Sequence, residues 1–390
     1  MSVSTITYFP VDNGGMTLIK LNDADNTTIL TDMYIRGAAD DENDETFDVS
    51  AALRKQLDQD QDVNPYVDVF LLTHNDDDHI KGIQNHFYLG DPAEYEKPKS
   101  GEEPKIIMKE IWCSSRFWKR ASDSNKLCDD AKAFNKEMKR RVKLFEANKS
   151  VQSAGNRALI IGKDPNGKTD NIEQIVKDID TTFTKINGKE LSHKVSVKVL
   201  GPIPQQEGEK DEDYEKKNRG SVILQISIFE GQYNNEILVT GDAEVFVWEC
   251  LWEKFSNLLS NLRYDVLSAP HHCSWHSISN DSQSSNDDPQ ISDSAKKSLS
   301  QAKEGAFIIA SSKTIKNDDN DPPSYAAKKE YLTIVSKDHF LCTEEYPSSL
   351  NIEPIVFNLT NVGPQLKAKK SNAKLTTAAI SATGEAFPHG

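Results

Sequence analysis

The chain has few cysteines and no long apolar run. Its 390 residues include only Cys113, Cys128, Cys250, Cys273 and Cys342, scattered without C-x-x-C spacing. An odd, sparse set of this kind suggests reduced thiols in a cytosol. No stretch reaches the apolar length that spans a bilayer, and the first residues lack the basic and apolar regions of a secretion signal. We therefore expect a cytoplasmic protein that is not embedded in a membrane.

Basic side chains are outnumbered by acidic ones, 46 to 61, so the formal net charge is -15. A surface with this charge repels polyanions at long range, which argues against a general DNA-coating role. It does not exclude a nucleic-acid or nucleotide-like substrate, because bound cations and local basic side chains can reverse the field inside a cleft.

Strand-like apolar runs alternate with helical segments, a pattern typical of a layered α/β fold with sheets inside and helices outside. A long charged helix is expected over 124–149, and its apolar stripe favours ordinary packing over a partner-binding groove. The Ser/Asp/Asn-rich stretch 277–299 predicts a flexible loop, and 367–390 predicts a low-complexity tail. We expect one domain over 1–366 with insertions near 91–150 and 277–299, and either insertion could dock a protein partner.

One apolar run is followed by a cluster of side chains that can bind a metal ion. Val67–Leu72 reads as a buried strand, and it is followed within a few residues by His74, Asp76, Asp78 and His79. Each of these groups costs free energy to bury unless something pairs with it. A divalent metal does so, and His and Asp are side chains that bind one. The alternative is a solvated turn, where Asp commonly satisfies loop backbone.

Two later strands end in the same way. One delivers Asp242 directly after Gly241, a residue that lets the backbone turn closely beside a ligand. The other ends in His271 and His272. Loops at strand ends, held by a rigid sheet, are where catalytic groups concentrate. We therefore predict that these three strand ends meet around a shared cation.

The order T-H-x-D-x-D-H-x-x-G, T-G-D-A-E and A-P-H-H-x-S resembles the metallo-β-lactamase superfamily. Within it, the chain is most similar to the β-lactamase-like domain of DNA-internalisation competence proteins and related stand-alone metallo-hydrolases. The segments Tyr8–Gly15 and Ile29–Asp32 are also similar to motifs of that group. The resemblance implies an αββα sandwich, with an inserted charged helix and a flexible Ser/Asp-rich loop as additions to it.

The resemblance also implies a ligand set. One metal would take His74 and Asp76, and the other would take Asp78 and His79. Asp242 matches the bridging carboxylate and His272 matches a late histidine ligand, with His271 beside it; which of that pair binds stays open. The implied cofactor is Zn²⁺, one or two ions, and Asp76, where many members carry histidine, makes Mn²⁺ a competitor.

Two departures from the family pattern accompany this ligand set. The region 217–221 lacks the third histidine that members often place before the bridging Asp, and 320–324 lacks the histidine of a late G-H-P segment. The missing third histidine motivates a different interpretation, a regulatory or binding subunit with an incomplete metal site.

The activity implied by the resemblance is hydrolysis by a metal-activated water, foremost of a phosphodiester in nucleic acid or a nucleotide-like substrate. Asp78 would orient the nucleophile, and His271 would donate a proton or hold an oxyanion. Arg219, Ser221 and Lys81 are the candidates for substrate binding. A hydrolase of an amide, lactone or thioester is the enzymatic alternative.

Overall fold

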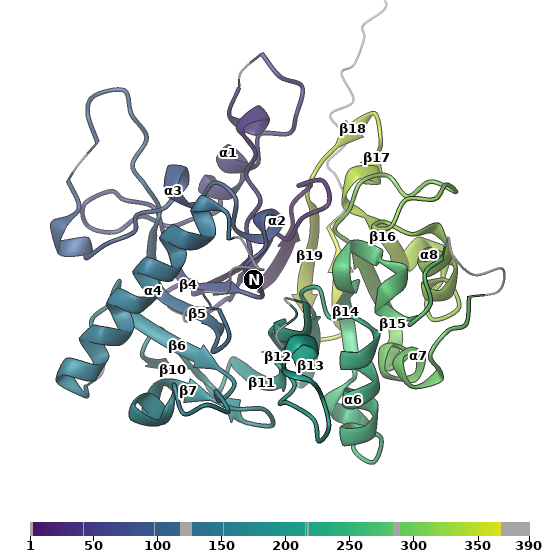
Figure 1. Cartoon of the computed structure of the whole chain (residues 1–390). Coiled ribbons are helices and arrows are strands. Elements are labelled where there is room, and N and C mark those ends of the chain that lie inside the picture. The colour runs from purple at the N-terminus through teal and green to yellow at the C-terminus, as the bar shows by residue number, and fades with distance from the viewer. Residues whose placement is uncertain are drawn as a thin grey trace, which may run out of the picture.

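The computed structural model describes residues 3–41, 43–96, 98–117, 127–150, 152–214, 216, 218–283 and 289–367. The tail expected over 367–390 therefore lies outside the described residues, apart from its first residue. Within the described residues, two large sheets lie side by side and helices cover their outer faces (Figure 1). None of the described helices combines the length and apolar character needed to cross a bilayer.

The first sheet has nine strands. In spatial order they are β20 (Gly363–Leu366), β19 (Ile355–Thr360), β1 (Thr5–Tyr8), β2 (Thr17–Lys20), β3 (Thr28–Thr31), β4 (Tyr66–Leu72), β5 (Ile107–Ser114), β6 (Arg157–Ile161) and β7 (Val176–Lys177). From β20 to β3 the neighbours are antiparallel, and from β3 to β7 they are parallel. Parallel strands end at the same edge, so the residues that follow β3 and β4 lie next to each other.

The second sheet has seven strands. In spatial order they are β16 (Phe340–Cys342), β15 (Ala302–Ala310), β14 (Tyr264–Ser268), β13 (Tyr233–Val239), β12 (Ile223–Glu230), β11 (Val195–Gly201) and β8 (Thr182–Phe183). Strands β13 to β16 are parallel, so the segments that follow β13, β14 and β15 emerge at one edge. Two small hairpins, β9 (Lys185–Ile186) with β10 (Lys189–Glu190) and β17 (Pro347–Ser348) with β18 (Asn351–Ile352), complete the described strands.

Three apolar cores separate the layers. The first lies between the nine-stranded sheet and the helices α1 (Val49–Arg54), α2 (Asp77–Ile80), α3 (Ile83–His86) and α4 (Asp129–Asn148). The second lies between the two sheets, where Trp112 of one faces Phe183 of the other. The third lies between the seven-stranded sheet and α6 (Val245–Phe255), α7 (Asp293–Leu299) and α8 (Tyr325–Tyr331). A short helix, α5 (Asp211–Tyr214), joins β11 to β12. The expected α/β class with sheets inside and helices outside is confirmed.

Helix α4 forms part of the outer layer. The predicted apolar stripe is buried in the first core, with Phe134 and Met138 fully inaccessible to solvent. On the same helix the buried Arg141 donates to Glu137 Oε1 at 2.7 Å and to the carbonyl of Met108 at 2.9 Å. The apolar face of this helix therefore packs on the sheet and is not available to a partner.

The expectation of a flexible loop throughout 277–299 is wrong for its last third. Residues 293–299 form α7, and residues 284–288 lie outside the described part of the chain. Ala295 and Leu299 enter the third core, and Ser298 Oγ donates to the carbonyl of Trp248 at 2.7 Å. The polar composition conceals this helix, because its buried face consists mostly of small residues spaced three and four apart.

The N-terminus of α7 gives a stability prediction. Ser292 Oγ accepts a hydrogen bond from the backbone N–H of Ala295 at 3.3 Å and donates to Glu249 Oε1 at 2.6 Å. Loss of an N-cap costs about 1 kcal/mol. We expect Ser292→Ala to lower the free energy of unfolding in urea by about that amount. Ser294→Ala, inside the same helix, is the matched control and should leave the midpoint near its original value.

Candidate metal centre

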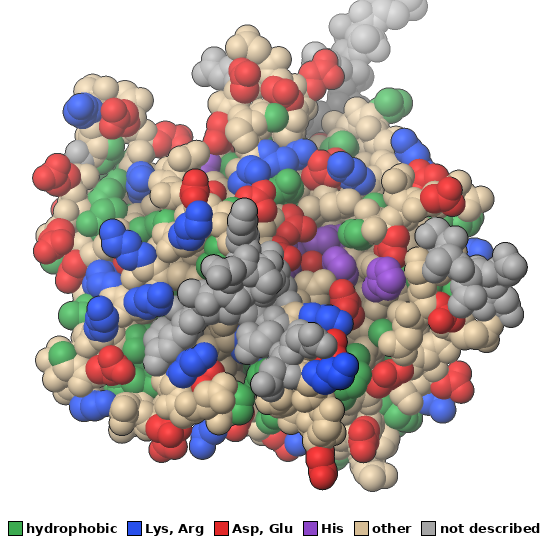
Figure 2. All heavy atoms as spheres, in the orientation of Figure 1, with side chains coloured by type: hydrophobic (Ala, Val, Ile, Leu, Met, Phe, Trp, Pro, Cys, Tyr) green, Lys and Arg blue, Asp and Glu red, His purple; other side chains and the backbone are tan. Residues whose placement is uncertain are grey.

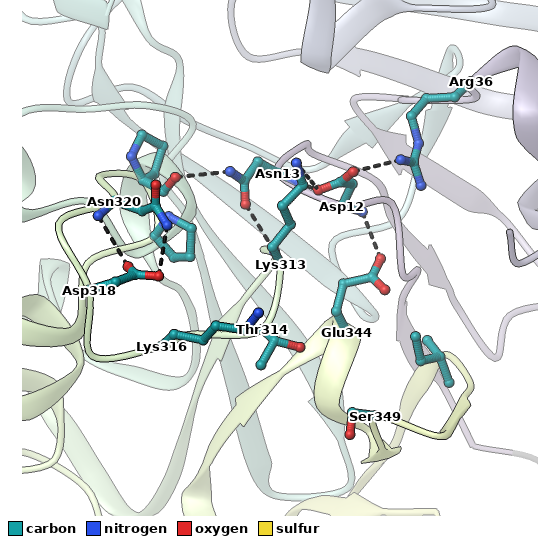
Figure 3. Close-up of a pocket in the computed structure, with 13 residues that line it drawn as sticks. Asp12, Asn13, Arg36, Lys313, Thr314, Lys316, Asp318, Asn320, Glu344 and Ser349 are labelled. Carbon is teal, nitrogen blue, oxygen red and sulfur yellow. Dashed lines mark hydrogen bonds and ion pairs between the residues drawn. The ribbon is translucent and has the colours of Figure 1, made fainter.

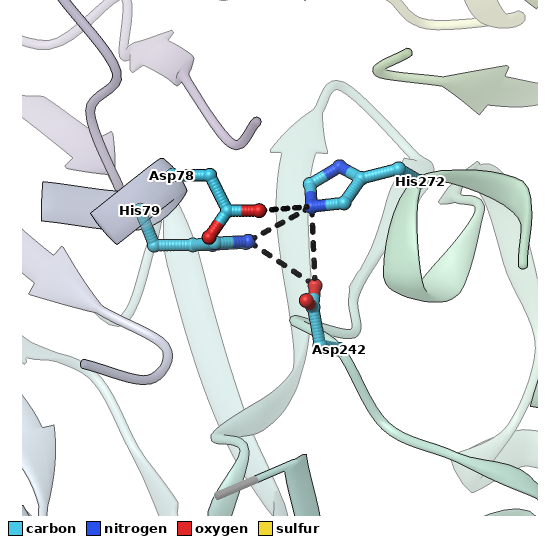
Figure 4. A group of neighbouring side chains, drawn as sticks. All are labelled: Asp78, His79, Asp242 and His272. Atoms are coloured by element: carbon cyan, nitrogen blue, oxygen red, sulfur yellow. Dashed lines mark hydrogen bonds and ion pairs between the residues drawn. The ribbon is translucent and has the colours of Figure 1, made fainter. Parts of the chain in front are cut away.

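Four side chains converge where the carboxyl ends of three strands meet. Asp78 and His79 come from α2, directly after β4, whereas Asp242 follows β13 and His272 follows β14 in the short helix η6 (Pro270–Cys273). Each offers one ligand atom, and these atoms lie within 4.8 Å of one another (Figure 4). Asp78 is partly exposed and the other three are buried. The predicted meeting of distant strand ends is therefore observed.

Two imidazoles in this group face each other through nitrogen atoms that carry no proton when the rings are neutral. His272 Nδ1 lies 2.9 Å from the carbonyl oxygen of Ser311, and His79 Nδ1 lies 2.8 Å from Asp32 Oδ2. Both partners only accept, so each Nδ1 carries the proton. The two Nε2 atoms lie 3.1 Å apart. In neutral rings their lone pairs point at each other, an arrangement that a shared cation stabilises.

Asp242 faces histidines through both of its carboxylate oxygens. Its Oδ1 lies 3.2 Å from His79 Nε2 and 3.5 Å from His272 Nε2. Its Oδ2 lies 3.2 Å from His74 Nε2 and 3.6 Å from His271 Nε2. One carboxylate thus separates two pairs of imidazoles. This is the arrangement expected of a carboxylate that bridges two cation positions.

Three buried atoms in and beside this group make no hydrogen bond to the described residues. They are His74 Nε2, Asp242 Oδ1 and His271 Nδ1. An unsatisfied buried polar group costs about 1–3 kcal/mol, and such groups are rare in native proteins. His74 Nε2 and Asp242 Oδ1 each lie close to an opposing ligand atom without hydrogen-bond geometry. The donor set therefore fits a divalent cation, and the mixture of imidazole and carboxylate suits Zn²⁺ or Mn²⁺.

The pKa shifts of Asp242 and His79 also fit a buried cation site. Burial raises the pKa of Asp242, but the surrounding histidines, His74 first, outweigh this and hold the pKa well below its usual range. Burial lowers the pKa of His79, yet Asp242 and Asp32 raise that pKa well above its usual value. In metal-free protein the raised pKa of His79 favours a proton on Nε2, between the two rings, where a metal ion would otherwise lie. Metal binding has to displace this proton, so metal affinity rises with pH.

The backbone around the histidine pair is held in a rare conformation. His271, His272 and Cys273 have φ values of 50°, 53° and 68°, in the left-handed region that costs a non-glycine residue about 1–3 kcal/mol. The His271 N–H donates to the carbonyl of Gly241 at 3.1 Å, which ties the turn to the Asp242 loop. This turn aims the two rings at different oxygens of Asp242. Both histidines of the pair therefore reach the bridging carboxylate.

The Gly14-Gly15 turn of the N-terminal segment packs against Asp78 and His79. The Gly15 N–H donates to the carbonyl of Asp78 at 3.0 Å. A Cβ at Gly15 would lie 2.8 Å from His79 Nδ1, and one at Gly14 would lie 2.8 Å from the Asp78 carbonyl oxygen. Distances this short do not occur for real Cβ atoms. The sequence Gly14-Gly15 is therefore needed for this turn to lie against the cluster.

Asp32 is a further residue in contact with the candidate metal centre, which the sequence alone does not assign. Its carboxylate accepts from the Thr73 N–H at 2.7 Å, from Thr73 Oγ1 at 2.6 Å and from His79 Nδ1. Such a partner fixes the tautomer and the orientation of a ligand histidine. The available signal was an Asp at the end of β3, the strand that pairs in parallel with β4. Only the fold establishes that pairing.

We expect Asp32→Asn to weaken metal binding by about 10- to 100-fold, because the amide cannot satisfy both Thr73 and the protonated Nδ1 of His79. Isothermal titration of metal-free protein with Zn²⁺ measures the change. Asp338→Asn, on the exposed helix η8 (Lys337–His339), is the control and should retain the original affinity.

The remaining predicted residues have different surroundings. Asp76 is the N-cap residue of α2 and is not one of the four converging side chains. Lys81 is half exposed and its ammonium pairs with Asp77 Oδ2 at 2.7 Å. Ser221 is buried against Gly241, and its Oγ makes no hydrogen bond to any residue that the structure describes. Ser221 thus lies beside the cluster in the region where the family pattern expects a histidine, whereas His193 is exposed.

The expectation that Arg219 grips a substrate is not supported by its contacts. Its guanidinium is buried and donates to both carboxylate oxygens of Glu209, at 2.9 and 3.1 Å. Further bonds go to the carbonyls of Ile203 and Pro204. These partners occupy its donors, so Arg219 holds the loop before β12 in place.

Comparisons with known proteins add little. No protein-family model and no curated protein matches the chain. Among solved structures the chain is similar to a protein of unknown function from Enterococcus faecalis V583, with 12% identity and a TM-score of 0.25. That alignment covers 77% of this chain and 56% of the other. A likeness this weak carries no argument about fold or function.

Proposed function

We propose that this chain is a metal-dependent hydrolase of the metallo-β-lactamase superfamily that cleaves phosphodiester bonds in nucleic acid or nucleotide-like substrates. The observation that carries the metal-dependent part is the 3.1 Å approach of His79 Nε2 to His272 Nε2, with both Nδ1 protons committed elsewhere. The choice of a phosphodiester rests on the motif order shared with the competence-protein branch.

Two sets of residues would hold cations, one on each side of Asp242. Asp78, His79 and His272 would serve the Oδ1 side, and His74 and His271 the Oδ2 side. A cation held there supplies Lewis acidity, which lowers the pKa of a water and polarises the substrate oxygen. In this proposal His271 takes the place of the third histidine that region 217–221 lacks. The site therefore needs no histidine in that region.

Residues of the chain would orient the attacking water and connect the buried site to solvent. The Asp78 side chain is 33% exposed, so this ligand reaches from the buried cluster to solvent and can accept a hydrogen bond from the attacking water. His271 presents Nε2 to Asp242, and its Nδ1 is buried. A buried Nδ1 cannot reach a leaving group. We therefore assign His271 as a cation ligand and not as the proton donor.

A substrate panel tests this function. Protein loaded with Zn²⁺ or Mn²⁺ should hydrolyse bis-p-nitrophenyl phosphate, and Asp78→Ala should abolish the reaction. Turnover of nitrocefin or a lactone without turnover of the diester would favour the amide, lactone or thioester alternative. Absence of bound metal after exposure to either ion would favour the regulatory subunit. Either result would overturn the proposal.

A further inference from the structure

A polar pocket lies on the far side of the glycine turn that touches the metal centre. Its volume is about 580 Å³, within the range of small-molecule sites. It is lined by Asp12, Asn13, Arg36, Lys313, Lys316 and Glu344, among others (Figure 3). The lining consists mainly of charged and amide side chains. This lining suits a polar ligand.

Two segments that line the pocket also contact the metal centre. Asn13 lines it, and Gly15, two residues on, donates to the carbonyl of Asp78. Lys313 lies on the other wall, where its N–H donates to Asn13 Oδ1 at 2.9 Å. Two residues before Lys313, the Ser311 carbonyl accepts from His272 Nδ1. Because consecutive Cα atoms lie 3.8 Å apart, the pocket walls begin within about 8 Å of residues that touch the ligands.

The acidic side chains of the pocket are already engaged. Asp12 accepts from Arg36 Nη1 at 2.6 Å, from Lys313 Nζ at 3.3 Å and from the N–H of Asn13 at 2.9 Å. Glu344 accepts from the Asp12 N–H at 2.8 Å, and burial raises the pKa of Glu344. Asp318 accepts from the backbone and side-chain amides of Asn320.

Two basic side chains keep donors for a ligand. The Lys313 side chain is 62% exposed and makes one ion pair, to Asp12. Lys316 is exposed and makes no hydrogen bond or ion pair with the described residues. Figure 2 shows both acidic and basic side chains around the histidines that reach the surface on this face. Lys313 and Lys316 are therefore the exposed donors of a pocket in which three basic side chains, including Arg36, balance the three acidic ones.

We propose that this pocket binds a second phosphate group of the substrate, adjacent to the phosphodiester at the metal centre. Lys313 and Lys316 donate to that phosphate, and Arg36 holds Asp12 so that the turn keeps its shape. The inference rests on the proposed function and refines it. The preferred substrate carries a phosphate next to the scissile bond, as an oligonucleotide or a terminally phosphorylated dinucleotide does.

The test compares kcat/KM for a thymidine dinucleotide with and without a terminal phosphate. We expect the original protein to prefer the phosphorylated substrate by about 100-fold, since each lysine contributes about tenfold through a charge-assisted hydrogen bond. In the double variant Lys313→Ala/Lys316→Ala the ratio should fall to about one. Lys337→Ala, an exposed lysine on η8, should keep the original ratio.

An unchanged ratio in the double variant would overturn the inference. If neither dinucleotide is cleaved, the proposed function fails, and calorimetric binding of the same two dinucleotides then tests the pocket alone. Tighter binding of the phosphorylated dinucleotide, lost in the double variant, supports the pocket. Equal binding of both dinucleotides to the original protein refutes it.

Discussion

Asp242→Asn is expected to remove bound metal and to lower kcat for a phosphodiester substrate by about 10³-fold. The substitution takes one negative charge from the centre of four imidazoles and leaves a single carbonyl oxygen to face two cation positions. A catalytic cation contributes several kcal/mol of transition-state stabilisation, and 1.36 kcal/mol corresponds to tenfold in rate, which gives the figure of about 10³.

Metal content by elemental analysis and steady-state kinetics measure this effect together. Glu244→Gln is the matched control, because it neutralises a carboxylate two residues away that accepts from Asn218 outside the cluster. The control should retain both metal and activity. Full metal occupancy in Asp242→Asn would contradict the assignment of Asp242 as a shared ligand.

His271→Ala is expected to lower the metal content from two ions to one per chain and to reduce kcat by about 10²-fold. His271 Nε2 faces Asp242 Oδ2, on the opposite side from His79 and His272. Its loss therefore weakens one cation position and leaves the four-residue group intact. Loss of one of two cations removes part of the stabilisation of charge, and about 2–3 kcal/mol of it corresponds to the stated loss of rate.

His276→Ala is the control for this variant. His276 lies five residues later, and its ring is 46% exposed and lies 3.9 Å from Asp321. The control should keep the original metal content. An unchanged metal content in His271→Ala would show that His271 is not a ligand and would reopen its role as a proton donor.

The central part of the site could be predicted from the sequence because each segment carries its own local signal. An apolar strand followed by His74, Asp78 and His79 conflicts with burial unless a cation is present, and the same holds after β13 and β14. The shared position of these residues, each directly after an apolar strand, also predicts that the three strand ends meet around one cation. Polar side chains that follow apolar strands in this way can be recognised from a single sequence.

Other features depend on pairings that no local pattern encodes. Strand β19 alternates Ile355, Phe357 and Leu359 toward the core, yet it pairs with β1 from the opposite end of the chain. The sequence analysis does not assign it. Asp32 contacts Thr73 and His79 only because β3 lies beside β4. The sequence predicts that Arg219 binds substrate, but its guanidinium pairs with Glu209, which lies in a charged loop whose position the sequence does not define.

Anomalous diffraction from crystals of the zinc-loaded protein tests the central claim most directly. The account predicts one strong peak bounded by Asp78, His79, Asp242 and His272, and a second on the Oδ2 side of Asp242 beside His74 and His271. A structure of zinc-loaded protein with no peak among these side chains, or with its zinc bound elsewhere, would contradict the account.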